Sequence, residues 1–104
     1  MDEKLNMPEL QPFLDPEGRL TALPTKYRKK LYAFYYLATK FEPGRQYTEP
    51  EINELLDGWT DFHDPATLRR ELYNRYLLNR TEDGRLYWTD EKLPTLETFL
   101  AKYL

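Results

Sequence analysis

The spacing of apolar residues along the chain predicts four helices separated by polar turns. Four stretches repeat apolar side chains at helical intervals: residues 26–41, 49–58, 65–76 and 94–104. Thr25 is the predicted N-cap of the first helix. Thr48 and Glu51 form a capping-box sequence at the second, and Asp64-Pro65 supplies an N-cap and a first-turn proline for the third. The fourth helix has apolar spacing that suits docking on the body of the domain or on a partner.

After the third helix the pattern changes to that of a β-hairpin, over residues 77–89. Asp83-Gly84 predicts a two-residue type I′ turn, in which both central residues have positive φ. That turn sets the register, with these cross-strand pairs: Arg80 with Tyr87 and Asn79 with Trp88. Tyr47, just before the second helix, is expected to form a brief extra strand.

These elements predict an α+β fold: a small winged helix-turn-helix domain with three helices, a C-terminal β-hairpin wing and an extra C-terminal helix. Residues 13–104 are expected to form this single domain, and residues 1–12 a flexible N-terminal tail. Residues 13–23 are predicted to be extended around a Pro-Glu-Gly turn. The apolar stripes predict one core, made of Leu31, Phe34, Leu37, Ile52, Leu55, Leu68, Leu72 and Trp88.

The composition excludes several classes of protein. The 104 residues suffice for one compact domain, and the absence of cysteine excludes disulfides, zinc–thiolate sites and thiol catalysis. No apolar run reaches the length of a membrane span, so no membrane partner is expected. The first ten residues are too polar and acidic for a secretory signal, and a cytoplasmic location is predicted.

Charge is unevenly distributed along the chain. The net charge of −3 and pI near 5.2 oppose the basic footprint that nucleic-acid-binding domains usually have. However, residues 24–45 carry six positive charges and one negative charge, while residues 46–62 carry five negative charges and none positive. A basic face on an acidic molecule and internal pairing of basic with acidic helices are both consistent with this pattern.

Few residues are candidates for catalysis or metal binding. His63 is the only histidine, and it lies in a polar turn with Asp61 and Asp64, three potential ligands crowded into four positions. The four glycines form no phosphate-binding pattern. We therefore expect a protein that is not an enzyme, with no catalytic residue, no metal site and no cofactor.

The third helix and the hairpin carry the candidates for binding DNA. In a helix-turn-helix the early exposed residues of the third helix face base edges, which here are Thr67, Arg70 and Asn74. Further candidates for holding phosphates are Arg69 and Arg85, with Lys26, Arg28 or Lys29 at the start of the first helix. The alternative is that Arg69 and Arg70 pair with acids such as Glu51, Glu54 or Glu71. DNA binding therefore stands only slightly ahead of a protein-interaction or effector-sensing role, and RNA stays open although no RNA motif is present.

Tyr32 and Tyr36 lie off the apolar stripe of the first helix. The interpretation that we favour is that residues 13–23 cover them. The alternative is a homodimer or protein interface, to which Phe99 and Tyr103 of the last helix would contribute.

Several short motifs, in order, resemble a known bacterial family. They are Phe13-Leu14-Asp15, Gly18-Arg19-Leu20, Leu23-Pro24, Phe41-Glu42-Pro43-Gly44, Tyr47-Thr48-Glu49 with Glu51, Leu68-Arg69-Arg70-Glu71-Leu72, and Arg80 with Asp83-Gly84 and Tyr87-Trp88. In these motifs the chain resembles the family called domain of unknown function 2087, over about three quarters of its length. The resemblance implies a setting in bacterial transcriptional regulation and no particular activity. One departure is Tyr76, where such domains tend to have a glycine after the third helix, so the junction between helix and wing is expected to differ.

Overall fold

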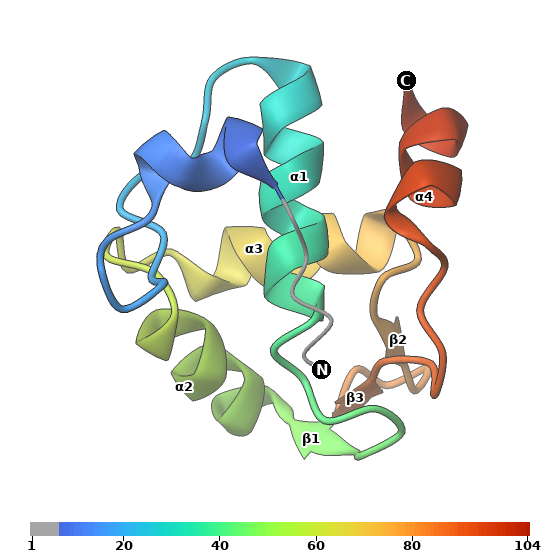
Figure 1. Ribbon diagram of the computed structural model, residues 1–104. Coiled ribbons are helices and arrows are strands. Elements are labelled where there is room, and N and C mark those ends of the chain that lie inside the picture. Colours follow the sequence, from blue (N-terminus) through green and yellow to red (C-terminus); the bar gives the residue numbers. More distant parts are fainter. Residues whose placement is uncertain (1–6) are drawn as a thin grey trace.

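The computed structural model describes residues 7–104 as an α+β fold in which the helices pack together and a small antiparallel sheet lies at one end of them (Figure 1). The elements in chain order are η1 (Pro8–Phe13), α1 (Tyr27–Ala38), β1 (Tyr47–Thr48), α2 (Glu49–Gly58), α3 (Pro65–Asn74), β2 (Asn79–Arg80), β3 (Leu86–Trp88) and α4 (Leu96–Tyr103). Helix α1 runs through the centre, with α3 crossing behind it and α4 beside it. Within the described part of the chain, no helix has both the length and the apolar character to cross a membrane.

The core forms where α1, α2 and α3 meet, as the apolar stripes predict. Six of the predicted core residues are buried: Leu31, Phe34, Leu37, Ile52, Leu68 and Leu72. Leu55 is only half-buried at the edge of this cluster. The prediction was wrong for Trp88, because its neighbour Tyr87 is the β3 side chain that faces the core. Successive side chains of a strand point to opposite faces, so burying Tyr87 turns Trp88 away.

The second and third helices begin at the predicted caps. Thr48 accepts a hydrogen bond from the Glu51 amide, and the Glu51 carboxylate accepts one from the Thr48 amide, which confirms the capping box. Asp64 caps α3 by accepting a hydrogen bond from the Thr67 amide. The predicted Thr25 cap is wrong, because the N-cap of α1 is Lys26, whose side chain accepts no capping bond.

Helix α1 also ends three residues before the predicted boundary. The Thr39 hydroxyl donates a 2.6 Å hydrogen bond to the Tyr36 carbonyl, and the Thr39 amide is shared among the carbonyls of the last turn. The chain then tightens through turn-like bonds from Lys40 to Leu37 and from Phe41 to Ala38. Bonds of that kind commonly close a helix.

The three strands form an antiparallel sheet in the order β1-β3-β2. The expected register is confirmed: Asn79 pairs with Trp88 and Arg80 with Tyr87. Tyr47 forms the predicted brief strand and pairs with Tyr87. The type I′ turn is wrong, because Gly84 has φ 72° but Asp83 is not among the residues with positive φ. Instead, the Thr81 carbonyl accepts a hydrogen bond from the Gly84 amide, and the Thr81 hydroxyl donates one to the Asp83 carboxylate. These bonds make a wider loop with the same pairing of the two strands.

The N-terminal part of the described chain packs onto α1. Leu10 of η1 is fully buried and Met7 nearly so, which corrects the predicted flexible tail for residues 7–12; the rest of that prediction, on residues 1–6, lies outside the described residues. Residues 14–20 then make a turn in which Leu14 bridges Leu20, as expected for an extended arm. Burial of the apolar side chains of η1 holds this segment in place despite its two prolines.

Arg19 fastens that arm to the turn between α2 and α3. Its guanidinium donates hydrogen bonds to the carbonyls of Asp57, Gly58 and Thr60, and it forms an ion pair with Asp61. Backbone bonds from Leu20 to the same turn complete the junction. The arm thus fixes the approach of α2 to α3, and with it the direction of α3.

Candidate nucleic-acid interface

Helix α3 buries Leu68 and Leu72 and turns a polar face outward. Arg70, Tyr73 and Asn74 are exposed on that face, at the three- and four-residue spacing that brings side chains together on a helix. Beside them lies the β2–β3 hairpin, which follows α3 after a tight reversal of the chain (Figure 1). The outer face of α3 and the hairpin therefore border a common groove.

The reversal after α3 is a Schellman motif built on Tyr76. The Tyr76 amide donates to the Tyr73 carbonyl, and the Leu77 amide donates to the Leu72 carbonyl at 3.0 Å. Tyr76 has φ 60°, the left-handed conformation that usually requires glycine. The expectation that the junction would differ without a glycine is therefore wrong. Burial of both Leu72 and Leu77 supplies the hydrophobic contact that stabilises the cap.

The groove between α3 and the hairpin, here called the α3–hairpin groove, contains two adjoining hollows. The first has a volume of about 290 Å³ and is lined by Arg69, Arg70, Tyr73, Asn74, Arg80 and Tyr87. The second has a volume of about 360 Å³ and is lined by Tyr73, Asn74, Tyr76, Leu78, Asn79, Arg80 and Trp88. The two share Tyr73, Asn74 and Arg80, so that a cationic hollow adjoins an aromatic hollow.

Two arginines of the groove keep their charge available. Among residues 7–104, neither Arg70 nor Arg80 forms an ion pair with a carboxylate, whereas Arg69, Arg75 and Arg85 each do. The Arg80 guanidinium lies 4.7 Å from the centre of the Tyr73 ring. The Tyr73 hydroxyl beside it raises the pKa of Arg80 above its ordinary value. The pair therefore presents a fixed positive charge stacked on an aromatic plane.

Arg69 is held within the domain. Its guanidinium donates to the Asn53 side chain and lies 3.5 Å from a carboxylate oxygen of Glu49, both on α2. It also lies over the Tyr87 ring, 5.8 Å from its centre. The alternative of internal pairing is thus correct for Arg69, although with Glu49 as the acid, and wrong for Arg70.

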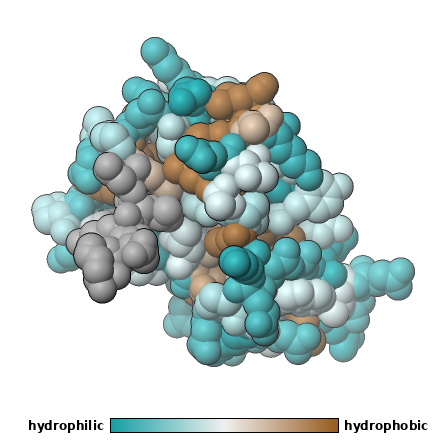
Figure 2. All heavy atoms as spheres, turned by 45° about the vertical axis from the view of Figure 1, so that its right-hand side comes forward, coloured by the Kyte–Doolittle hydropathy of each residue, from teal (hydrophilic) through white to brown (hydrophobic). Residues whose placement is uncertain are grey.

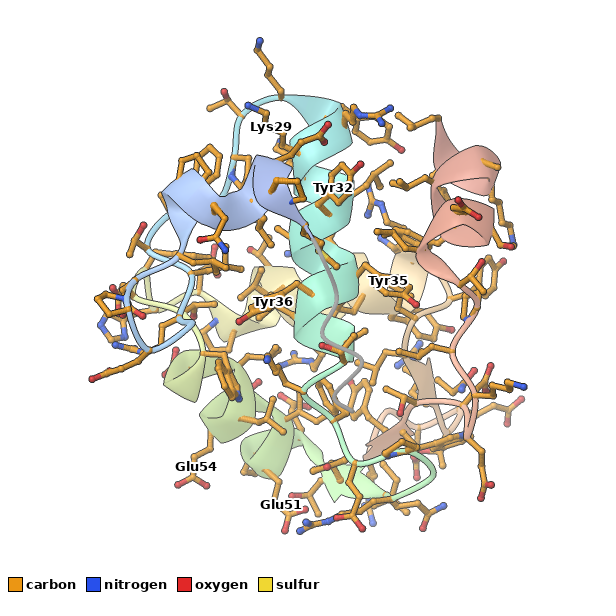
Figure 3. All side chains as sticks on the ribbon, viewed as in Figure 1. Lys29, Tyr32, Tyr35, Tyr36, Glu51 and Glu54 are labelled. Carbon is orange, nitrogen blue, oxygen red and sulfur yellow. The ribbon has the colours of Figure 1, made fainter. Side chains whose placement is uncertain are left out.

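The other residues predicted to bind nucleic acid lie apart from one another. Arg85 at the hairpin tip is exposed, with its Nε 3.8 Å from Asp83. Thr67 is half-buried and serves the N-terminal turn of α3. Lys26 and Lys29 stand at the N-terminal end of α1, at the opposite end of the molecule from the hairpin (Figures 1 and 3). The structure therefore brings Arg69, Arg70 and Asn74 together and leaves the two lysines apart.

The groove residues that the sequence prediction missed include three aromatic side chains and an arginine. Tyr73, Tyr76, Arg80 and Trp88 all line the hollows. Two signals were present in the chain: Tyr73 follows Arg70 by three residues on the helix, and Arg80 faces Tyr87 across the hairpin. No local pattern, however, indicates that the hairpin folds back against α3.

The predicted aromatic interface is mostly internal. Tyr32 and Phe99 are buried, and Tyr103 is half-buried beside Phe99, with 5.1 Å between ring centres. Tyr36 donates a 2.7 Å hydrogen bond to the Gly18 carbonyl, so the arm covers it as we favoured. Figure 3 shows Tyr36 pointing toward that arm and Tyr35 pointing toward α4. Tyr32 and Phe99 consequently do not contribute to an exposed interface.

Helix α4 docks on the body of the domain. The Tyr35 ring packs on Phe99, with 5.6 Å between ring centres, and the Tyr35 hydroxyl donates to the Pro94 carbonyl. Burial raises the pKa of Tyr35, as expected for a phenol removed from water. On the face that includes α4, hydrophobic side chains form small groups among hydrophilic ones (Figure 2).

His63 is exposed on the turn before α3, with Nδ1 3.9 Å from an Asp57 carboxylate oxygen. Across residues 7–104, no three histidine, aspartate or glutamate side chains come together closely enough to hold a metal ion.

These features define a small α+β domain with a groove of arginines and aromatic side chains between its third helix and its hairpin. Residues 19–89, well over half of the chain, match the family DUF2087, described as an uncharacterized protein conserved in bacteria. The chain belongs to this family. Neither the curated proteins nor the solved structures compared with it contain a match.

Proposed function

We propose that this domain binds nucleic acid through the α3–hairpin groove, as a non-enzymatic, cytoplasmic winged helix-turn-helix module in bacterial transcriptional regulation. The observation that carries the proposal is the convergence of Arg70 from α3 and Arg80 from β2, both without a carboxylate partner among residues 7–104, on one groove. Unpaired guanidiniums from two elements are suited to phosphates and base edges.

The order of the elements supports the winged-helix assignment. The chain runs α1-β1-α2-α3-β2-β3, and its sheet has the order β1-β3-β2. In a helix-turn-helix the third helix enters the major groove and its exposed side chains reach the bases. In that arrangement Arg70 would contact guanine and Asn74 adenine, while Arg85 on the hairpin would contact phosphate.

The acidic helix α2 does not prevent this arrangement. Glu49, the α2 acid that contacts a groove residue, is already paired with Arg69. Glu51 and Glu54 point away from the body of the domain (Figure 3). Their repulsion of a polyanion is screened beyond about 8 Å at physiological ionic strength.

The test is a fluorescence-anisotropy titration of labelled promoter and mixed-sequence DNA at low salt. Wild-type protein is expected to bind, and Arg70→Ala to weaken specific binding by about 1–3 kcal/mol and relax the preference at one base position. Arg85→Ala should weaken binding to both DNAs and flatten the salt dependence. Lys26→Ala, which removes the same charge at the far end of α1, is the control and should have little effect.

Absence of binding by the wild-type protein at tens of micromolar, roughly where non-specific binders already register, would overturn the proposal. A protein-interaction or effector-sensing role would then lead. The observation that favours this second candidate is the pairing of Arg69 with Glu49 on a domain of net charge −3.

A further inference from the structure

The second hollow of the α3–hairpin groove is suited to a ligand other than duplex DNA. A base pair within a duplex presents its edges, while its faces are covered by the neighbouring pairs. The second hollow is lined by the rings of Tyr73, Tyr76 and Trp88. Aromatic side chains recognise nucleic acid through the faces of unpaired bases.

We propose that the α3–hairpin groove takes an unpaired nucleotide, and that the domain prefers single-stranded nucleic acid, DNA or RNA, to duplex. This inference rests on the proposed binding of nucleic acid through this groove, and it replaces the duplex, with its contact between Arg70 and guanine, by an unpaired strand. The phosphate would lie in the cationic hollow, against Arg70 and Arg80, and the base in the aromatic hollow, against Trp88. Because Tyr73 and Arg80 line both hollows, one nucleotide can occupy the two together.

The groove is prepared for stacking in two ways. The Arg80 guanidinium already lies over the Tyr73 ring at 4.7 Å, so a planar cation and a ring are in contact before any ligand arrives. Tyr76 is 70% exposed and adopts a left-handed backbone conformation, which directs an aromatic side chain out of the tight turn after α3. Side chains fixed in advance lose less conformational entropy on binding.

The volume of the aromatic hollow fits one base. At about 360 Å³ it lies at the low end of the roughly 300–1,000 Å³ range for small-molecule sites. Leu78 is buried, and the Asn79 amide group is held by Asp90 at 2.9 Å, so the wall near the base is fixed. A hollow of this size accepts the face of a base without hydrogen-bonded readout, and little sequence preference is expected.

The two tryptophans allow a direct test. Trp59 is the C-cap of α2 and packs against the Lys40 ammonium at 4.2 Å, outside both hollows, whereas Trp88 lines the groove. Trp59→Phe leaves Trp88 as the sole tryptophan, and Trp88→Phe leaves Trp59. Each protein is titrated with oligothymidylate and oligouridylate of about 10 nucleotides, within the site sizes of single-strand binders, and with a hairpin duplex of equal phosphate number.

We expect both single strands to quench the fluorescence of the Trp59→Phe protein and to leave that of the Trp88→Phe protein nearly unchanged. Trp88→Ala should weaken single-strand binding by about 5- to 150-fold, the loss typical of one stacked base. Quenching by only one of the two strands would identify DNA or RNA as the ligand and support the inference.

Duplex binding as tight as single-strand binding, or quenching that is equal at both tryptophans, would overturn the inference and leave the proposed function standing. Absence of binding to all three probes would overturn both. Circular dichroism of each variant shows whether it is folded, and the quenching experiment with Trp59→Phe does not depend on the stability of the Trp88→Ala protein.

Discussion

The amide of Leu77 donates a 3.0 Å hydrogen bond to the carbonyl of Leu72, and this bond closes the end of α3 around Tyr76. Tyr76 occupies the position where a Schellman motif normally has glycine, with φ 60°. Its ring packs against the Lys102 ammonium of α4 at 4.8 Å. The domain therefore keeps the motif and accepts backbone strain at one exposed residue.

Replacing Tyr76 should separate that strain from the loss of the ring. Tyr76→Ala and Tyr76→Gly both lose the contact with Lys102, but only alanine keeps the left-handed penalty, about 1–2 kcal/mol. In the other direction, glycine increases the conformational entropy of the unfolded chain, which lowers the stability of the glycine variant by about 0.4–1 kcal/mol. We expect the glycine variant to be the more stable by about 0.5–1 kcal/mol in urea unfolding, from these two terms. Equal stability of the two variants would contradict the strain.

Arg69 and Arg70, adjacent in the chain, should differ in what they do. Arg69→Ala removes the contacts with Asn53 and Glu49 that join α3 to α2, and is expected to cost about 1–3 kcal/mol of unfolding free energy. Arg70→Ala removes an exposed side chain and should change stability by about 0.5 kcal/mol or less. Denaturant unfolding of both variants measures the difference. A larger loss from Arg70→Ala than from Arg69→Ala would contradict the pairing described above.

Leu72→Ala should be among the costly core substitutions. Leu72 is fully buried between α3 and the rest of the core, so its truncation is expected to cost about 2–5 kcal/mol. Leu55→Ala on α2 is the matched control, because Leu55 is only half-buried and the same truncation should cost less. A loss below about 1 kcal/mol for Leu72→Ala would mean that the residue is peripheral to the core.

Acid should loosen the tip of the hairpin. The Thr81 hydroxyl and the Arg85 amide donate to the Asp83 carboxylate, and these bonds lower the pKa of Asp83 below its ordinary 3.8. A lowered folded-state pKa means that the contribution of Asp83 to stability is fully present above the unfolded value and is lost as pH falls through the folded value. The chemical shift of the Asp83 carboxyl carbon, followed by NMR, should report this pKa.

The control for the acid effect is Asp83→Asn. Asparagine keeps an oxygen that can accept a hydrogen bond from the Arg85 amide but does not titrate. The protection factor of that amide against hydrogen exchange should therefore no longer fall with acid below the ordinary carboxyl range. An Asp83 carboxyl that titrates at or above 3.8 would show that the tip bonds do not stabilise the charged form.

The sequence by itself determined the features that depend on neighbours in the chain. The capping box of Thr48 and Glu51, the Asp64 cap and the pairing of Arg80 with Tyr87 all follow from interactions across a few residues. Short-range signals of this kind specify helices and hairpins because each carries its own hydrogen bonds. They also placed the apolar faces of α1 and α3 correctly.

Only the tertiary structure decided which side chains of those elements meet. Because side chains alternate along a strand, Tyr87 and Trp88 face opposite ways, but it is the docking of the helices that buries Tyr87. Likewise Arg69 and Arg70 are alike in sequence, and the approach of α2 neutralises one and leaves the other exposed. Burial and ion pairing depend on segments far apart in the chain, and their relative positions follow from packing the whole core, which no local pattern contains.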